Sequence, residues 1–376
     1  MVTAAVLPVF LVGALAGPIR QELSFGTAAL GFATAAFFGA AALSSFGFGR
    51  LAERLGPVGS MQASGLLSAL VLAAIAVFGR SYGLLLVMLA AGGLANGLAQ
   101  PAANLYVARV VDVRRQGLAV AVKQSAIPIA TLLGGLAVPA FGLTVGWRWA
   151  FGVGSLLALV GIVLVGTAVA ERPARAVGSA PRRSQAVRSA LLPLCIGAGL
   201  GAGAAGALGT FLVTSGVEYG LNRAVAGLLA AFGGAICVFV RIVAGLRADR
   251  LGSGHLRTVA TLLGLGAVAY AVMALGNPVA FVLLTPLAFG AGWGWPGLFN
   301  LAVVLANPDA PAAATGITQS GTYLGAMAGP VVFGWAAGAV GFGAAWLTAA
   351  AAAAAAMVAI RVGRHLIRAA RAAPVV

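Results

Sequence analysis

Charged residues are scarce in this chain of 376 residues. They make up 8% of it, against about 25% in soluble globular domains, and only seven are acidic. Hydrophobic residues account for 61%, and apolar runs of about 20 residues recur from end to end, which is the helix length that crosses a hydrocarbon core. This composition excludes a soluble globular protein and predicts an all-α membrane protein, because helices satisfy their own backbone groups in lipid.

Residues that carry catalysis or hold metals are also few. The two cysteines, Cys195 and Cys237, lie in apolar runs, where they indicate small packing residues rather than a disulfide or a metal pair. His255 and His365 are expected at the membrane surface, and the acids lie mostly in connectors. A G-x-G-x-x-G pattern at 201–206 has no strand before it, so we expect helix packing there. We therefore expect no enzyme, no catalytic residue, no metal and no cofactor.

The apolar runs predict twelve transmembrane helices. Cutting the chain at its charged or Pro/Gly/Asn-marked connectors places them at 2–18, 27–48, 60–79, 83–108, 117–145, 148–170, 189–214, 223–246, 257–275, 279–305, 312–340 and 343–363. One connector is long and polar. It predicts an N-terminal six-helix bundle (1–170), a cytoplasmic linker (171–188) and a C-terminal six-helix bundle with a short basic tail (189–376).

Positive charge is confined almost entirely to the connectors and predicts the orientation. The net charge of +16 comes from 22 Arg and one Lys, and cytoplasmic loops collect such residues. With both termini in the cytoplasm, 18 Arg lie on the cytoplasmic side, Arg241 included, and four lie opposite, at positions 20, 80, 148 and 223. The N-terminus lacks the features of a cleaved signal peptide, so we expect the first span to be retained. The high Arg, Ala and Gly content fits a bacterial inner membrane protein.

The two halves of the chain repeat each other. A shift of 195 positions places Gln124 on Gln319 and Pro101 on Pro296. The chain has only seven Gln and 16 Pro, so such matches at one offset are hard to obtain by chance. We therefore expect a six-helix unit duplicated in parallel orientation.

An octapeptide is duplicated at almost the same offset. Residues 49–56 read Gly-Arg-Leu-Ala-Glu-Arg-Leu-Gly, and residues 245–252 read Gly-Leu-Arg-Ala-Asp-Arg-Leu-Gly. This G-x-x-[AD]-[DE]-R-x-G pattern resembles the signature loop of the major facilitator superfamily of secondary transporters. Two departures are Glu53 in place of the commoner Asp, and Pro57-Val58-Gly59 in place of the usual second basic cluster. The resemblance implies two six-helix bundles that alternate access to a central site.

The resemblance also implies a conformational latch in each of these loops. Glycine there lets helices approach closely. The acid is implied to contact the N-terminus of a helix in the opposite half, where free N–H groups and the helix dipole favour an anion. A solvated loop carboxylate is the alternative. The latch residues are Gly49, Glu53 and Arg54 in the first loop, and Gly245, Asp249 and Arg250 in the second.

Polar side chains share one face of the fourth predicted span. Asn96, Gln100 and Asn104 are spaced i, i+4, i+8. Unpaired polar groups are costly in hydrocarbon, so this face must meet a cavity or another helix. Trp293 and Asn300 likewise share a face of the tenth span. The resemblance implies that helices one, four, seven and ten line the cavity, so we expect substrate contact there, with interhelical hydrogen bonds and packing as the alternatives.

Lys123 is the one charge that we predict well inside a span, six residues past Gly117 and therefore about 9 Å along the helix. It lies beside Gln124, and this pair aligns with Gln319 in the second half. The lysine stem can snorkel to the cytoplasmic headgroups. Alternatively, the ammonium group supplies a positive charge to an anionic substrate. The near-absence of acids inside the spans favours an anion over a proton-driven cation exporter.

These features predict a secondary transporter that moves a small polar or anionic organic solute by alternating access, acting in uptake. The alternative is an exporter of drugs or a secreted metabolite on the same fold. A membrane enzyme or a sensor would need clustered catalytic side chains or a soluble domain. We expect a monomer surrounded by lipid, with a small-molecule solute and no nucleic acid as partner. Proton coupling is left open.

Overall fold

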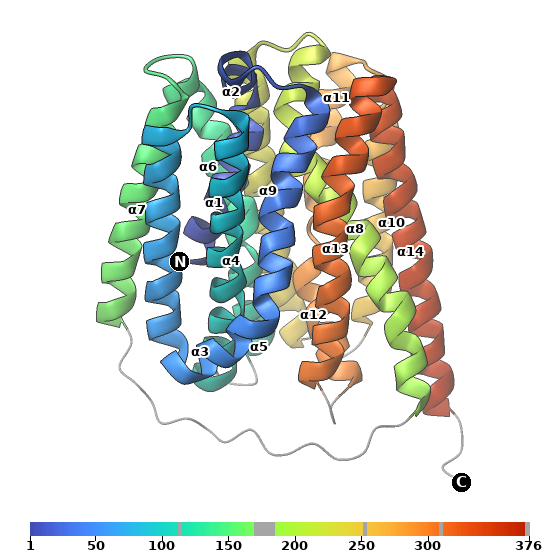
Figure 1. Ribbon diagram of the computed structural model, residues 1–376. Coiled ribbons are helices and arrows are strands. Elements are labelled where there is room, and N and C mark those ends of the chain that lie inside the picture. Colours follow the sequence, from blue (N-terminus) through green and yellow to red (C-terminus); the bar gives the residue numbers. More distant parts are fainter. Residues whose placement is uncertain (112–114, 169–184, 251–253, 308–310, 373–376) are drawn as a thin grey trace.

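The computed structural model describes residues 1–111, 115–168, 185–250, 254–307 and 311–372, and these form a bundle of helices with no strand among them. Figure 1 shows the helices running side by side, with α2 at the upper end and the last turns of α14 at the lower end. The prediction of an all-α membrane protein is confirmed.

Among its described residues, the first half of the chain forms seven α-helices and one π-helical turn. They are α1 (Val2–Ala14), α2 (Ala16–Leu23), α3 (Thr27–Phe78), α4 (Tyr82–Val110), α5 (Gln116–Gln124), α6 (Ala126–Ala137), η2 (Val138–Gly142) and α7 (Trp147–Ala168).

The second half has seven α-helices and a π-helical turn of its own. They are α8 (Gln185–Glu218), α9 (Arg223–Arg250), α10 (His255–Met273), α11 (Pro278–Leu287), η3 (Ala288–Gly292), α12 (Pro296–Ala306), α13 (Pro311–Ala339) and α14 (Phe342–Ala372). Most of the predicted linker 171–188 lies outside the described residues, and α8 includes its last four.

Among the described residues, ten helical segments are long and apolar enough to cross a membrane, or eleven if the bent pair α1 and α2 is one span. The 29-residue helix α13 falls outside that count although Figure 1 shows it beside the others. It carries Thr and Gln side chains along its first half, which lower its apolar content. A total of twelve spans therefore stays a prediction.

Several predicted spans are interrupted. The first bends by 72° between α1 and α2. The second and third are continuous in α3 except at Gly56, whose φ of 72° is a conformation that favours glycine. The fifth breaks at Ser125, between α5 and α6, and the tenth passes through η3 before α12 begins at Pro296. The last two breaks border the pocket described below.

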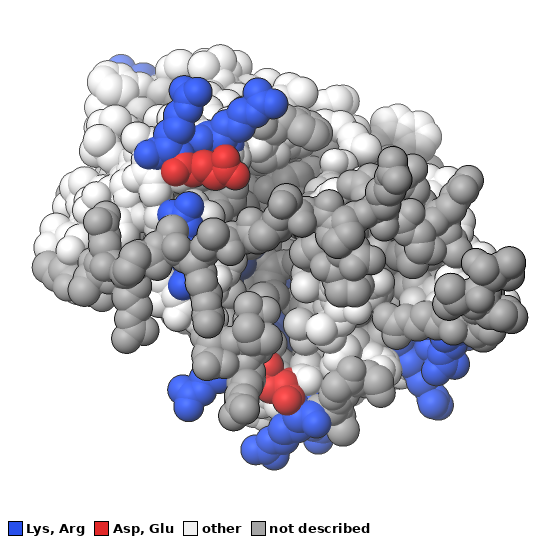
Figure 2. Space-filling view, turned by 90° about the horizontal axis from the view of Figure 1, so that it is seen from below, with Lys and Arg blue, Asp and Glu red and all other residues white. Residues whose placement is uncertain are grey.

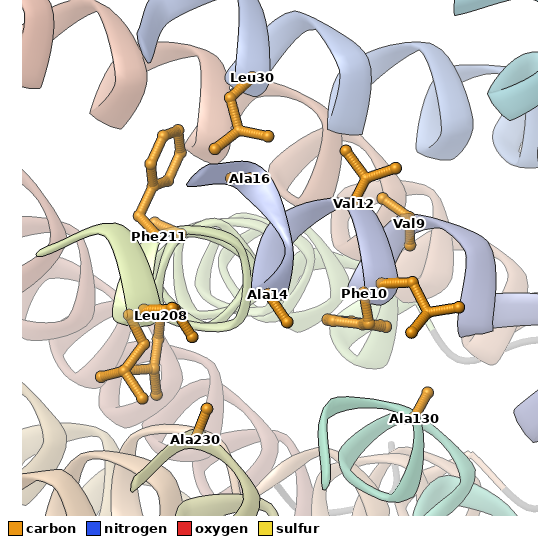
Figure 3. Close-up of a cluster of buried hydrophobic side chains, with 14 of the residues drawn as sticks. Val9, Phe10, Val12, Ala14, Ala16, Leu30, Ala130, Leu208, Phe211 and Ala230 are labelled. Atoms are coloured by element: carbon orange, nitrogen blue, oxygen red, sulfur yellow. The ribbon is translucent and has the colours of Figure 1, made fainter. Parts of the chain in front are cut away.

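The buried core is centred on α1. Figure 3 shows Phe10 and Ala14 of this helix facing Leu208 of α8, Ala230 of α9 and Ala130 of α6. These side chains are at most 8% exposed. Because α1 and α6 belong to the first half and α8 and α9 to the second, the core joins the two halves, and burial of this apolar surface holds them together near the middle of the bundle.

Glycines allow α8 and α13 to cross closely. A Cβ added at Gly329 would lie 2.3 Å from the backbone of Gly203, and one added at Gly321 would lie 2.3 Å from the Cys195 carbonyl oxygen. A side chain at Gly321 or Gly329 of α13 would force these helices apart. The G-x-G-x-x-G pattern at 201–206 is therefore part of a helix-packing surface, as predicted, and its neighbours Gly325 and Gly199 also meet.

Large apolar side chains also cover the outside of the bundle. Leu43 is 79% exposed and Trp335 is 66% exposed, and many others are similarly open. Exposed apolar surface on this scale requires a nonaqueous surrounding. The exterior fits the hydrocarbon of a bilayer.

Arginines gather toward the lower end. Figure 2 shows this face, where Lys and Arg side chains form separate groups and acidic side chains lie beside two of them. The chain positions place Arg50 and Arg54 near the α3 kink, Arg247 and Arg250 at the end of α9, and Arg361, Arg364 and Arg368 toward the end of α14. Arg20, Arg80, Arg148 and Arg223 belong to the helix ends and turns at the upper end.

Candidate functional site

A pocket lies between the two halves, next to the core. It encloses about 70 Å³. Four helices supply its polar lining: α4, α5, α9 and α13. The polar lining residues are Asn96, Gln100, Gln124, Arg241, Gln319, Thr322 and Tyr323, and the apolar ones include Phe10, Phe38, Trp293 and Trp295. None of the described residues that line it is acidic.

Five of the eight predicted substrate-binding residues line this pocket: Asn96, Gln100, Gln124, Trp293 and Gln319. The Gln100 side chain lies 3.4 Å from the Asn96 amide oxygen, to which it donates a hydrogen bond one turn away on α4. Asn96 is only 2% exposed. The shared face of α4 therefore does border a cavity, and its amides also bond to each other.

The other three predicted residues are Asn104, Lys123 and Asn300, which are not in the pocket lining. Asn104 and Asn300 each lie four residues, and so about 6 Å along their helices, from the lining residues Gln100 and Pro296, and Lys123 directly precedes the lining residue Gln124 at the end of α5. In each case the displacement is toward the lower end. Asn104 is exposed, and Lys123 and Asn300 are partly exposed. They extend the polar surface below the pocket.

The sequence prediction missed three polar residues of the pocket lining, Arg241, Thr322 and Tyr323, and Arg241 is the charged one. It lies inside α9 and is 1% exposed. Its guanidinium donates one hydrogen bond to the Gln124 carbonyl in the first half, and a second, of 2.7 Å, to the Trp293 carbonyl in the second half. Its Nε has no hydrogen-bond partner among the described residues. Counting Arg241 among the cytoplasmic arginines was wrong, as was naming Lys123 as the one charge well inside a span.

Both carbonyls are available because the helices break there. In an α-helix the Gln124 carbonyl would accept from the N–H of residue 128, but that residue is proline, which has no N–H. Trp293 lies between η3 and α12, outside regular helix. Arg241 therefore supplies donors that the local backbone lacks, and in doing so it joins α9 to the break between α5 and α6.

Aromatic side chains close the pocket toward the upper end. The rings of Phe10 and Trp293, one from each half, lie 5.7 Å apart. Both pack on Gly209, where an added Cβ would lie 2.5 Å from the Trp293 ring. Ala14 and Val213, one turn above Phe10 and Gly209, line a separate vestibule of about 330 Å³. This vestibule also contains Arg20, Glu218 and Arg223.

At the lower end, the two halves meet where α9 crosses α5. The Asp249 carboxylate accepts hydrogen bonds from the backbone N–H groups of Gly117, at 2.8 Å, and Leu118, at 3.0 Å. These are the second and third residues of α5, whose N–H groups have no acceptor within the helix. The resemblance implied a contact of this kind for Asp249. Its action as a latch stays a prediction.

The first loop differs from the second. Glu53 and Arg54 are exposed, and among the described residues Glu53 has no hydrogen-bond partner. An added Cβ at Gly49 meets no described atom within 4 Å, whereas one at Gly245 would lie 2.6 Å from the Ala121 Cβ. The helix that carries the first loop, α3, approaches α13 closely nearer the upper end, for instance at Gly31 and Pro330. Close helix contact through the loop glycine is thus present in the second copy alone.

Comparison with protein families decides the assignment. The model of the Major Facilitator Superfamily matches residues 1–319. The chain belongs to this superfamily. This match confirms the resemblance to the superfamily that the loop motifs indicated. The superfamily consists of transporters rather than enzymes. We therefore identify the protein as a secondary transporter.

Solved structures of the superfamily share its fold. A bacterial homologue of the human lysosomal transporter Spinster, in an inward-facing and occupied conformation, matches with a TM-score of 0.73 and 16% identity, over 98% of this chain and 94% of that one. The inward-facing and unoccupied conformation matches with a TM-score of 0.70 and 15% identity over the same shares. These identities establish the fold alone. A comparison with curated proteins finds no significant match.

Proposed function

We propose that this superfamily member takes up a small polar or anionic organic solute by alternating access. The observation that carries the proposal is the composition of the pocket, which combines four amide side chains with a buried arginine and has no acid among its described lining residues. Amides and a guanidinium are donors for carboxylate or hydroxyl oxygens. An organic cation would find no charge partner there.

The polar residues below the pocket support a path toward the lower end. We propose that Asn104, Lys123 and Asn300 contact the solute between the pocket and that end, and that Phe10 and Trp293 separate the pocket from the upper vestibule. The arginine distribution supports a cytoplasmic location of the lower end and of both termini, in a bacterial inner membrane. We propose a monomer, with proton coupling open.

Uptake into vesicles tests the proposal. The purified protein is reconstituted into liposomes, and accumulation of labelled small carboxylates, neutral polar solutes and a hydrophobic cation is compared with protein-free vesicles. We expect accumulation of a carboxylate or a polar solute. Replacing Gln100 or Gln319 with Leu should lower it at least tenfold, while Gln62→Leu on α3, outside the pocket lining, should not.

The same assay can reject the proposal. Export of the hydrophobic cation, with no movement of carboxylates or polar solutes in either direction, would support the exporter of drugs or a secreted metabolite instead. If Gln62→Leu lowers accumulation as much as the pocket variants do, the pocket amides support folding rather than contact the solute.

A further inference from the structure

The positive charge of Arg241 is balanced by no carboxylate in the described part of the protein. The acids described there are Glu22, Glu53, Glu218 and Asp249, and none of them lines the pocket. Asp249 is eight residues further along α9, about 12 Å, and binds the α5 N-terminus. The guanidinium stays protonated when buried, and its partners among the described residues are the Gln124 and Trp293 carbonyls and the Cys237 side chain one turn away on α9. A buried cation of this kind is costly in a membrane.

Through these two carbonyls, Arg241 connects the two halves of the protein. Gln124 belongs to the first half and Trp293 to the second. One guanidinium therefore ties the halves together beside the pocket, at the α5/α6 break. Alternating access requires the halves to move relative to each other about the central site. The tie to Gln124 must be lost or reformed when they do.

We propose that the ligand is a small monocarboxylate and that its carboxylate replaces the Gln124 carbonyl on the Arg241 guanidinium. This rests on the proposed function and makes the substrate class narrower. A carboxylate binds a guanidinium through two parallel hydrogen bonds, each stronger than one to a neutral carbonyl. This exchange neutralises the buried charge of Arg241. It also breaks the hydrogen bond between Arg241 and Gln124 that connects the two halves. Binding is thereby coupled to the release of α5 and α6 from α9.

The dimensions of the pocket limit the size of this ligand. Its accessible volume of about 70 Å³ is small beside the roughly 300–1,000 Å³ of pockets that hold drug-sized ligands, so it favours a ligand of a few heavy atoms. Acetate and lactate have four and six heavy atoms. Trp293, whose carbonyl receives the other hydrogen bond, also forms part of the aromatic closure with Phe10. A ligand held on Arg241 therefore lies directly below that closure.

Matched pairs of probes test the substrate class. Acetate and L-lactate are compared with acetamide and lactamide, which have the same shape without the charge. Dissociation constants are measured from tryptophan fluorescence, because Trp293 and Trp295 line the pocket, and from the thermal unfolding midpoint. We expect the wild-type protein to bind the acids at least tenfold more tightly than the amides. Arg241→Gln should remove this preference, and Arg241→Lys should keep part of it.

A second variant tests the exchange without altering the arginine. Pro128→Ala restores an N–H that can donate to the Gln124 carbonyl within the helix, which weakens the tie to Arg241. A guanidinium released in this way should bind acetate severalfold more tightly than in the wild type. Pro193→Ala, which removes a proline from α8 outside the pocket, should leave the acetate affinity unchanged.

Each result either supports or overturns the inference. Unchanged acetate binding in both Arg241→Gln and Pro128→Ala would show that Arg241 is a structural support only, while the proposed function would stand with another anion-binding group. Equal binding of acids and amides would show that the ligand is not selected as a monocarboxylate. The proposed function would not be affected by that result. The proposed function itself fails only if the vesicle assay shows no movement of any polar or anionic solute. If Arg241→Gln does not fold, the Pro128→Ala result decides.

Discussion

The Asp249 carboxylate of α9 is hydrogen-bonded to the backbone N–H of Gly117, 132 residues away at the start of α5, at a distance of 2.8 Å. The bond joins the end of a helix in the second half to the beginning of one in the first. Free N–H groups and the helix dipole both favour a carboxylate at this position. The contact joins the two halves of the chain at the α5/α9 crossing.

Asp249→Asn is therefore expected to favour the form that is open at the lower end. The amide keeps one acceptor oxygen and loses the charge, which should cost about 1.5 kcal/mol, or roughly tenfold in population. The measurement is the labelling rate of a cysteine at position 104, an exposed position below the pocket, in a background with Cys195→Ala and Cys237→Ala. We expect faster labelling in the Asn variant.

Glu53→Gln is the matched control for this experiment. Glu53 is the corresponding acid of the first loop but is exposed, without a hydrogen-bond partner among the described residues. The control should label like the parent protein. Equal labelling rates for the parent and Asp249→Asn, with full transport, would mean that the Asp249 contact does not control opening.

The two loop glycines should differ in their tolerance of a side chain. A Cβ at Gly245 would lie 2.6 Å from the Ala121 Cβ and 2.8 Å from the Gly117 carbonyl oxygen, whereas Gly49 faces open space. We expect Gly245→Ala to lower stability by about 1–3 kcal/mol through overpacking. Gly49→Ala should be neutral or slightly stabilising, since alanine favours helix. Thermal unfolding midpoints of the two variants provide the comparison, and equal midpoints would contradict this view of the α5/α9 crossing.

The sequence was informative where a pattern has one physical cause. The spacing of Asn96 and Gln100 places them on one helix face, and polar groups in hydrocarbon need a cavity or a partner, so the pocket border could be predicted. The paired loop motif led to the superfamily and to the Asp249 contact. Neither pattern could show that Asn104 lies a turn below the pocket, because depth in a bundle depends on how helices pack.

The prediction places Arg241 on the cytoplasmic side with Arg247, Arg250 and Arg257, although Arg241 lies inside the predicted span 223–246. A signal for its true position was present. Gly234, Cys237 and Gly245 lie on the same helix face as Arg241, at i−7, i−4 and i+4. Small residues in this pattern indicate a face that packs closely on another helix. The break at Ser125 was likewise not predicted, although Pro128 removes a helical hydrogen bond there.

The orientation of the bundle can be tested with reporters. A reporter fused after Val376 or inserted near Ser179 should behave as cytoplasmic, because 17 of the 18 arginines assigned to that side still favour this orientation. An insertion after Gly220, in the turn between α8 and α9, should give the opposite signal. Signals from Ser179 and Val376 on different sides of the membrane would overturn the predicted span number.

Lys123 is expected to attract the anionic solute before it reaches Arg241. It lies at the end of α5, directly before Gln124, which lines the pocket, and it is partly exposed. Lysine presents a compact, mobile charge, whereas arginine presents a broad fork. Lys123→Gln should therefore lower carboxylate uptake about tenfold with little change in the thermal unfolding midpoint, and Lys123→Arg should restore part of it.

Arg115→Gln is the control for Lys123, because it removes an exposed charge from the start of the same helix. It should leave uptake close to that of the wild type. If Lys123→Gln transports normally, the lysine stem serves to bring its charge to the headgroups. The prediction that Lys123 selects the solute would then be wrong. The transporter assignment would be unaffected, because the family match and the Asp249 contact do not depend on this lysine. If instead both variants lose uptake equally, the effect is one of total positive charge at the lower end, and a rise in ionic strength should reduce wild-type uptake to the same extent.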